Sequence, residues 1–351
     1  MEKYQIFETL DGGFHAGTKA NGDIADIAER LGYEKVIIRQ VNQKDSKIAK
    51  LQRQLVWKKD FNGAFDKIEN NSIVLLQNPF HHNQLTRNRI LKKLKTQKNV
   101  KYICIIHDVE KLRAFRYNDY YKNEFDFMLE IGDVFIVHNE KMLKYFESLG
   151  VESSKLINLE IFDYLDENID EDKKISFEKS ITVAGNLDTT KCGYIGELGN
   201  LGIKVNLFGP NFDEQMKNNN NNNITYFGSF PPNDIPSHLN KGFGLVWDGT
   251  SINGCQGQSG QYLKYNNPHK LSLYLSSGLP VVIWKDAAEA KYVMDKKVGI
   301  AVGSLMELKS IFDDMDENSY YELCENVKFI SKKLRKGHFA TKAIKEAEAL
   351  L

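Results

Sequence analysis

The stretch that decides the fold is residues 266–284, NNPHKLSLYLSSGLPVVIW. Asn267 can cap a helix, because its side-chain oxygen accepts hydrogen bonds from the free N–H groups of a first turn. Pro268 suits the first helical position, where no N–H donor is needed. Gly278 supplies the left-handed residue with which many helices end. The β-branched run at 281–284 is typical of a buried strand, so the stretch predicts a short helix followed by a strand of an α/β sheet.

The first turn of this predicted helix carries the polar side chains of His269, Lys270 and Ser272. A helix N-terminus already attracts anions through its free N–H groups and its dipole. Lys270 adds a positive charge there, so the turn is a candidate seat for a diphosphate. The residues alone leave a second interpretation open, which is an ordinary α/β helix with a solvated first turn.

Length and composition favour two domains in a reducing compartment. At 351 residues the chain exceeds the usual size of one domain, and its 42% apolar content can fill two cores. A net charge of zero argues against a nucleic-acid partner. The four cysteines form no CxxC pair, so we expect no structural zinc, no disulfide and a cytoplasmic location. The sequence has no signal-peptide pattern and no apolar run of about 20 residues, so no transmembrane segment is predicted.

The first half of the chain reads as repeated strand–helix units of a doubly wound sheet. A strand at 4–9 leads into a glycine-rich loop at 11–19, which contains Gly17 and Thr18, and then into a helix. The loop does not fit G-x-G-x-x-G, so it predicts no dinucleotide site, and a plain turn is an equal interpretation. Further strands of this half are expected at 36–38, 72–77, 100–106 and 133–137.

Polar residues follow several of these strands, and ligands of open α/β sheets lie beyond the carboxyl ends of strands. His107 and Asp108 directly follow the strand at 100–106. Either side chain could act as a general base on a hydroxyl group. Asp108 could equally cap the segment that follows it. The histidines lack the spacing of metal ligands on one element, so no metal site is predicted.

The acidic run near 166–172 changes the composition and predicts a domain boundary. We expect an N-terminal Rossmann-like domain over 1–160, a C-terminal one over 161–335, and a helix over 336–351 that could pack back on the N-terminal domain. Strands of the second domain are expected at 180–184, 203–208, 224–227, 242–247, 281–284 and 298–302. The turns at Gly185, Gly228 and Asp248 would then share one rim with the helix at 268–277.

Four sequence words carry a resemblance to a known family. They are IHDVEKLR at 106–113, VAGNL at 183–187, GLVWDG at 244–249 and NPHKLSLYL at 267–275. These words resemble the bacterial glucosyltransferase 3-like family, which includes galactofuranosyltransferase-like members. The resemblance implies a GT-B fold, with two Rossmann-like domains facing across a cleft, a UDP-sugar donor, a cytoplasmic enzyme and self-association into a homo-oligomer.

The resemblance also implies a donor site, residue by residue. The UDP diphosphate and ribose would be held by Asn267, Pro268, His269, Lys270, Leu271 and Ser272, with Gly17 and Thr18 reaching the donor from the first domain and Gly185, Asn186 and Lys191 completing the pocket. A Lys at 191 would lose the bidentate phosphate contact of an Arg. His107 and Asp108 are the catalytic candidates, assigned on position alone.

Together, these observations predict a hexosyltransferase that uses UDP-glucose or UDP-galactofuranose. The acceptor would be a hydroxyl of a glycan or glycopeptide in surface polysaccharide or glycoprotein synthesis. The helix N-terminus and Lys270 would stabilise the leaving UDP, so neither a metal nor a cofactor is expected. Peripheral contact with a membrane stays open. The alternatives are a UDP-sugar epimerase or hydrolase of the same fold, and a non-catalytic sugar-nucleotide-binding subunit of a transferase complex.

Overall fold

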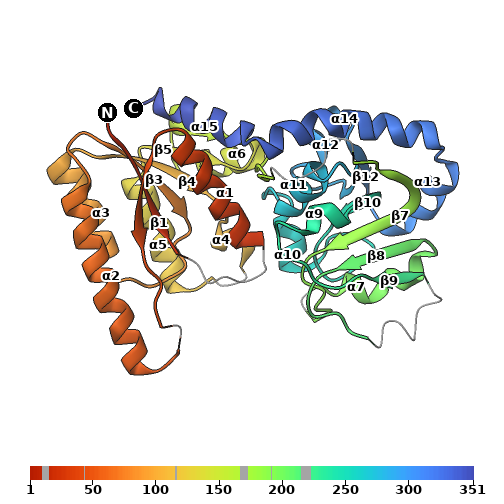
Figure 1. The fold of residues 1–351 in the computed structure, drawn as a ribbon, viewed down its shortest axis with the longest axis horizontal. Helices are drawn as coiled ribbons and strands as arrows, with labels where there is room; N and C mark the ends of the chain where they lie inside the picture. Colours follow the sequence, from red (N-terminus) through yellow and green to blue (C-terminus); the bar gives the residue numbers. More distant parts are fainter. Residues whose placement is uncertain (10–15, 43, 115–116, 167–172, 191, 215–222) are drawn as a thin grey trace. The chain divides into compact units, whose positions relative to one another are not determined.

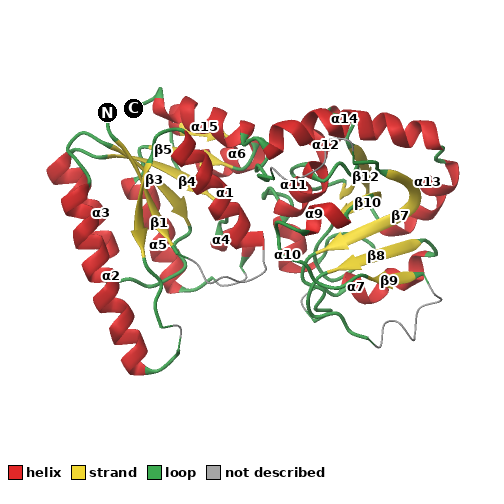
Figure 2. Cartoon of the chain, viewed as in Figure 1, coloured by secondary structure: helices red, strands yellow, loops and turns green. Residues whose placement is uncertain are grey.

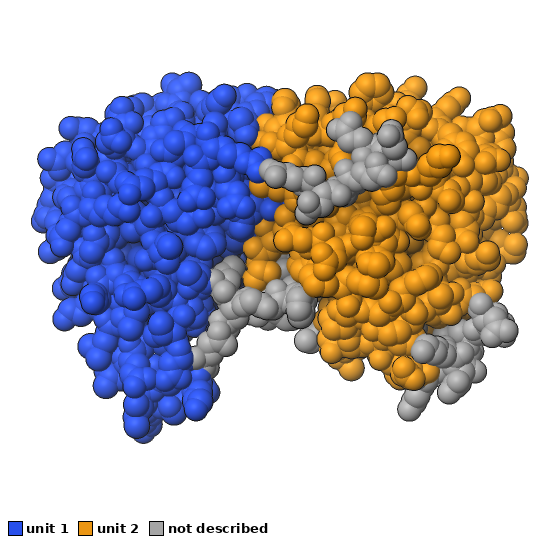
Figure 3. All heavy atoms as spheres, in the orientation of Figure 1, with its two compact units in different colours: residues 1–13, 21–160, 340–351 blue, residues 14–20, 161–339 orange. Residues whose placement is uncertain are grey.

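The computed structural model describes residues 1–9, 16–42, 44–114, 117–166, 173–190, 192–214 and 223–351 (Figure 1). The chain divides into two compact units, which Figure 3 colours separately. Unit 1 comprises Met1–Gly13, Asn21–Glu160 and Ala340–Leu351, and unit 2 comprises Phe14–Ala20 and Ile161–Phe339. Each unit has a parallel sheet of its own with helices around it (Figure 2).

Unit 1 is built on a six-stranded parallel sheet with the order β2-β1-β3-β4-β5-β6. Every residue of its β3 strand, IVLLQN, is buried, as expected of a parallel strand with both faces covered. The elements are β1 (Lys3–Glu8), α1 (Ala16–Arg30), β2 (Glu34–Ile38), α2 (Lys47–Lys67), β3 (Ile73–Asn78), α3 (Arg87–Lys98), β4 (Lys101–Ile106), α4 (Glu110–Arg113), α5 (Asp119–Ile131), β5 (Val134–Val137), α6 (Glu140–Ser148), β6 (Leu156–Asn158) and, near the C-terminus, α15 (His338–Glu348).

The strand order of unit 1 reverses at one place. The chain runs from β1 outward to β2, and then returns to place β3 on the other side of β1. In open α/β sheets, ligands bind beyond the carboxyl ends of the strands at such a switch point. Glu8 ends β1 and Asn78 ends β3, so the polar environment of these two residues is the part of unit 1 that concerns function.

Unit 2 repeats this plan with the strand order β12-β11-β10-β7-β8-β9, again all parallel. Its switch point lies between β7 and β10. The elements are β7 (Ser176–Ala184), α7 (Tyr194–Glu197), β8 (Lys204–Phe208), β9 (Ile224–Tyr226), α9 (Ile235–His238), β10 (Lys241–Val246), α10 (Gly257–Tyr262), α11 (His269–Ser276), β11 (Val281–Trp284), α12 (Ala290–Asp295), β12 (Gly299–Val302), α13 (Leu308–Asp314) and α14 (Glu317–Arg335).

Two predictions of local structure need correction. The stretch at 11–19 is not a loop throughout: α1 begins at Ala16, so Gly17 and Thr18 lie in its first turn, where the flanking Ala and Lys residues favour helix. Residues 10–15 lie outside the described part of the chain. The strands predicted for the first half also omitted β6, whose three residues are too few to show a strand period. Within the described residues, no helix combines the length and the apolar character needed to cross a bilayer.

Candidate functional site

The start of α11 lies at the switch point of unit 2. Lys270 Nζ donates to the carbonyl of Trp247, just after β10, across 3.4 Å. A Cβ atom at Gly185, just after β7, would lie 3.4 Å from Lys270 Cε. The lysine therefore occupies the place where the carboxyl ends of β7 and β10 meet, and where the first turn of α11 presents its N–H groups.

Buried contacts hold α11 in this position. The Ala184 N–H at the end of β7 donates to the hydroxyl of Tyr274 across 2.8 Å. Gly244 in β10 makes room for the Tyr274 ring, because a Cβ atom there would lie 2.1 Å from the ring. Ser272 Oγ donates to the Phe162 carbonyl across 2.6 Å. The hydrogen bonds of Tyr274 and Ser272 and the packing of the Tyr274 ring on Gly244 together fix the position of α11 on the sheet.

The C-terminal end of α11 agrees with the prediction, and its N-terminal end differs from it. Gly278 has φ +92° and follows the C-cap, Ser277, as predicted. The N-cap, however, is Pro268 with an extended backbone and no side-chain acceptor, so Asn267 is not the cap. Pro268 has no polar side-chain group to receive an N–H, which leaves the mouth of the helix suited to an acceptor from outside the chain.

The residues predicted to bind the donor fall into two groups. Pro268, His269 and Lys270 are half-buried and reach the surface. Asn267, Leu271 and Ser272 are buried. In this structure these three residues support the turn and present almost no accessible surface to a ligand.

Lys270 keeps its charge despite its surroundings. Burial alone would lower the pKa of its ammonium group, but the charge of Asp248, helped by more distant groups, raises that pKa above the ordinary value. The carboxylate of Asp248 also accepts from the N–H of Gly249 across 2.7 Å. A permanently positive group beside a helix N-terminus is what a diphosphate needs.

His269 is neutral near pH 7. Burial first, and then the charge of Lys19, lowers the pKa of its imidazole to about 4, against a hydrogen bond with the Asp163 backbone. Its Nε2 atom has no hydrogen-bond partner within the described residues. Lys19, in the first helical turns of α1, donates to the Leu165 carbonyl across 2.6 Å and lies 5.0 Å from the ring centroid of Tyr164. That ring lies 5.1 Å from the His269 ring, so Lys19, beside the predicted Thr18, joins the candidate site.

The glycine turns of unit 2 form one rim, as predicted for Gly185 and Gly228. The Gly185 N–H donates to Phe208 at the end of β8, and Gly209 donates to Gly228 across 2.8 Å. Asn186 is exposed on this rim, where its Oδ1 accepts from Asn211 Nδ2 across 2.8 Å. Lys191, also predicted here, lies outside the described residues.

The catalytic candidates lie in unit 1, beyond β4. Asp108 Oδ2 accepts from Arg113 Nη1 across 2.6 Å. It is not the cap of α4, because that helix has Val109 as its N-cap and no side-chain cap. His107 Nε2 and Gln77 Oε1 form a hydrogen bond of 2.8 Å, and Gln77 lines a small pocket at the switch point of unit 1.

That pocket contains a carboxyl group that the sequence analysis missed. Glu8, the last residue of β1, lines it together with Phe80 and His81. Gln84 Nε2 donates to Glu8 Oε1 across 3.0 Å, and Arg87 Nη1 lies 3.7 Å from the same oxygen. The volume open to a water-sized group is about 20 Å³, enough for one hydroxyl. Only the position of Glu8 at the end of the first strand could have signalled it.

Burial makes Glu8 a weak acid. It raises the pKa of the Glu8 carboxyl to about 7; the charge of Arg87 opposes this shift and that of Glu124 adds to it. Glu124 is itself buried, which raises its pKa, while it accepts from the Phe80 N–H and from Asn78 Nδ2, each across 3.0 Å. A carboxyl that titrates near neutrality can both accept and donate hydrogen bonds to a hydroxyl.

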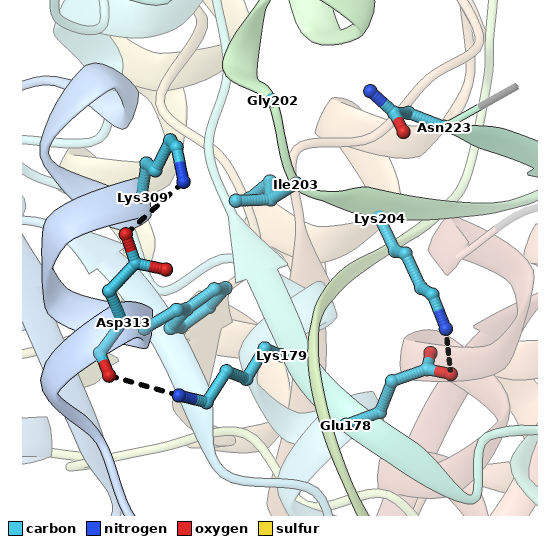
Figure 4. A pocket seen from close by; sticks show the side chains of 9 residues that line it. Glu178, Lys179, Gly202, Ile203, Lys204, Asn223, Lys309 and Asp313 are labelled. Carbon is cyan, nitrogen blue, oxygen red and sulfur yellow. Dashed lines mark hydrogen bonds and ion pairs between the residues drawn. The ribbon is translucent and has the colours of Figure 1, made fainter. Parts of the chain in front are cut away.

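A larger cavity of about 260 Å³ lies in unit 2 at the opposite edge of the sheet (Figure 4). Its charged side chains already bind one another: Lys309 pairs with Asp313 at 3.1 Å and Lys204 with Glu178 at 3.4 Å. Lys179 donates to the Asp313 carbonyl. Because this edge holds the amino ends of β7 and β8, the cavity is separate from the candidate site. Among the described residues, no three His, Cys, Asp or Glu side chains gather as metal ligands would.

Known proteins resemble this chain along nearly its whole length. Profiles of the N-terminal and C-terminal domains of glucosyltransferase 3-like proteins match residues 3–161 and 181–347. The β-1,6-galactofuranosyltransferase WbbI of Escherichia coli K12 is 33% identical over 339 residues, which are 94% of this chain and 94% of that protein. This chain belongs to the glucosyltransferase 3-like family. Glucosyltransferase 3 of Streptococcus gordonii is 24% identical over 93% of this chain and 92% of its own.

This glucosyltransferase 3-like chain is accordingly a glycosyltransferase. The solved structure of Anabaena Alr3699/HepE, in complex with UDP and glucose, covers 99% of this chain and all of its own, with a TM-score of 0.62 and 13% identity. That likeness concerns the fold. It confirms the predicted GT-B class, with one doubly wound sheet in each unit.

Proposed function

We propose that this chain transfers a hexosyl group from a UDP-sugar to a hydroxyl of a glycan or glycopeptide. The observation that carries the proposal is the start of α11, where Lys270 lies at the β7/β10 switch point of unit 2. Two relatives named galactofuranosyltransferase and glucosyltransferase support hexose as the group, and fold neighbours solved with UDP support the nucleotide. Glucose and galactofuranose are the favoured sugars.

On the donor side, the first turn of α11 would bind the diphosphate. Its N–H groups point out of the helix, and Lys270 supplies a full positive charge beside them. The neutral ring of His269 has only one N–H, and its hydrogen bond with the Asp163 backbone already uses it, so His269 would contribute its backbone N–H. As the bond between the sugar C1 and the phosphate oxygen breaks, negative charge grows on UDP, and these groups would stabilise it. This charge from the protein supports the expectation that transfer needs neither a metal nor a cofactor.

On the acceptor side, a hydroxyl oxygen attacks C1 and its proton must pass to a base. His107 and Asp108 are the candidates predicted from the sequence. The Asp108 carboxylate is already engaged by Arg113 across 2.6 Å. His107 is bonded to Gln77, on the wall of the pocket that contains Glu8. We therefore favour His107 of the two, with Glu8 and Gln77 holding the acceptor hydroxyl.

The test is transfer from purified donors to a panel of glycan acceptors, with released UDP and the new glycan both measured. A thermal-shift screen of UDP-glucose, UDP-galactofuranose, UDP-galactose and UDP-N-acetylglucosamine selects the donor first, because a bound ligand raises the melting temperature. We expect equal amounts of UDP and product. UDP release with free sugar would instead indicate a hydrolase, and binding without turnover would indicate a non-catalytic subunit. Cytoplasmic location and self-association stay predictions.

A further inference from the structure

The amino-terminal half of α2 carries an apolar stripe that none of the residues described by the structure covers. Ile48, Leu51 and Leu55 are 72%, 62% and 59% exposed. Their spacing of three and four residues places all three on one face of the helix. In Figure 1 this end of α2 projects beyond the sheet of unit 1, and it forms the lower projection of the blue unit in Figure 3.

The stripe is not the face by which α2 packs on its own unit. Trp57, Phe61 and Ala64 are buried and fix the helix to unit 1. Because successive residues of a helix are rotated by about 100°, these buried side chains lie on average about half a turn around the helix from the exposed stripe. The helix is therefore apolar on two opposite faces, and the second face has no partner among the described residues.

Positive charge borders the stripe. Lys47 and Lys58 flank it on one side and Lys59 on the other, by the same helical geometry. All three are exposed, and none has an ion-pair partner in the part of the chain that the structure describes. Helices α2 and α3 together hold twelve Lys or Arg and two Asp, although the whole chain has no net charge.

A fourth exposed apolar side chain adjoins the same helix. Leu85 is 79% exposed and lies in the segment between β3 and α3. Its N–H donates to Gln54 Oε1 across 3.1 Å, and Gln54 Nε2 donates to the Asn83 carbonyl across 2.7 Å. The Gln54 side chain thus ties this segment to α2 and places Leu85 beside that helix.

We propose that this surface, made by Ile48, Leu51, Leu55 and Leu85 with Lys47, Lys58 and Lys59 around them, docks unit 1 on an anionic lipid bilayer. Apolar side chains would enter the boundary between headgroups and acyl chains, while the lysines reach back to the phosphates. A second copy of the chain is the poorer occupant, because a two-fold contact would bring the same lysines together. The proposal does not depend on the transfer reaction.

The test is sedimentation of the full chain with vesicles of phosphatidylcholine alone or with 30 mol% phosphatidylglycerol. We expect binding to the anionic vesicles at least tenfold stronger than to the neutral ones, and weaker at high salt because charge attraction is screened. The double variant Leu51→Gln/Leu55→Gln should lose at least tenfold of this binding. The matched control is Phe329→Gln, which changes an equally exposed apolar residue in unit 2. It should bind like the wild type.

Two results would overturn the proposal. One is equal binding of the wild type and the double variant to anionic vesicles, with the variant's thermal unfolding unchanged. The other is a dimer of the wild type, seen by light scattering, that the double variant abolishes without any vesicle binding by either protein. Transferase activity on a water-soluble acceptor should be the same in both proteins, so failure here leaves the proposed function separately testable.

Discussion

Replacing Lys270 by Ala removes a full positive charge that lies at the β7/β10 switch point beside the first turn of α11. Two unit charges about 4 Å apart interact by about 4 kcal/mol at an effective dielectric constant near 20. The ammonium group is half-buried and already has Asp248 nearby, so we reduce this to about 2 kcal/mol for the diphosphate. The dissociation constant for UDP should therefore rise about 30-fold.

Isothermal titration calorimetry of UDP and of uridine separates the charge from a general loss of structure. Uridine lacks the diphosphate, so its affinity should change less than twofold in Lys270→Ala. Lys264→Ala is the matched control, because Lys264 is an exposed lysine of the same unit whose Nζ lies 5.5 Å from the Trp284 ring centroid. It should leave both affinities unchanged. Equal loss of UDP and uridine affinity, or no loss of either, would refute the assigned role.

Three further substitutions test the supports of the two switch points. Tyr274→Phe leaves the buried N–H of Ala184 unpaired and should lower the free energy of unfolding by about 1–3 kcal/mol in urea; an unchanged midpoint would contradict this. Ser272→Ala should lower the free energy of unfolding by about 1 kcal/mol, because the hydrogen bond to the Phe162 carbonyl is lost, and should change the KM for the donor little. A raised KM at unchanged stability would instead mean that Ser272 contacts the ligand directly. Burial raises the pKa of the Glu8 carboxyl to about 7, so the stability that its protonated form contributes is fully present below about pH 4.5. About 3 kcal/mol of the free energy of unfolding should be lost as the pH rises to 7. In urea unfolding measured at a series of pH values, Glu8→Gln should remove most of this pH dependence, and the same pH dependence in variant and wild type would disprove it.

The second sheet and its candidate site could be predicted because their signals are local. The end signals around 268–278 depend on Pro and Gly at fixed places, and the helix boundary differs from the prediction by one residue. Strands such as β11 and β4 are continuous apolar runs, so a single sequence shows them. The strand order that brings β7 beside β10 follows from the crossover rules of doubly wound sheets only once all strands are known.

What the sequence did not reveal depends on contacts between distant residues. Glu8 looks like any acidic residue at the end of a strand, and its raised pKa comes first from burial and then from the charge of Glu124, more than a hundred residues away. Ser272 has a polar side chain of the kind that binds ligands, yet its hydroxyl donates its hydrogen bond to the Phe162 carbonyl. The exposed stripe of α2 escaped notice because apolar residues on both faces of a helix show no single helical period.

The most direct test of the central claim is a crystal structure of this chain with UDP bound. The diphosphate should lie against the first turn of α11, within hydrogen-bond distance of the N–H groups of His269 and Lys270 and of the Lys270 ammonium, beside Gly185. A nucleotide whose phosphates lie at another edge of unit 2, with Lys270 still donating only to the Trp247 carbonyl, would contradict it.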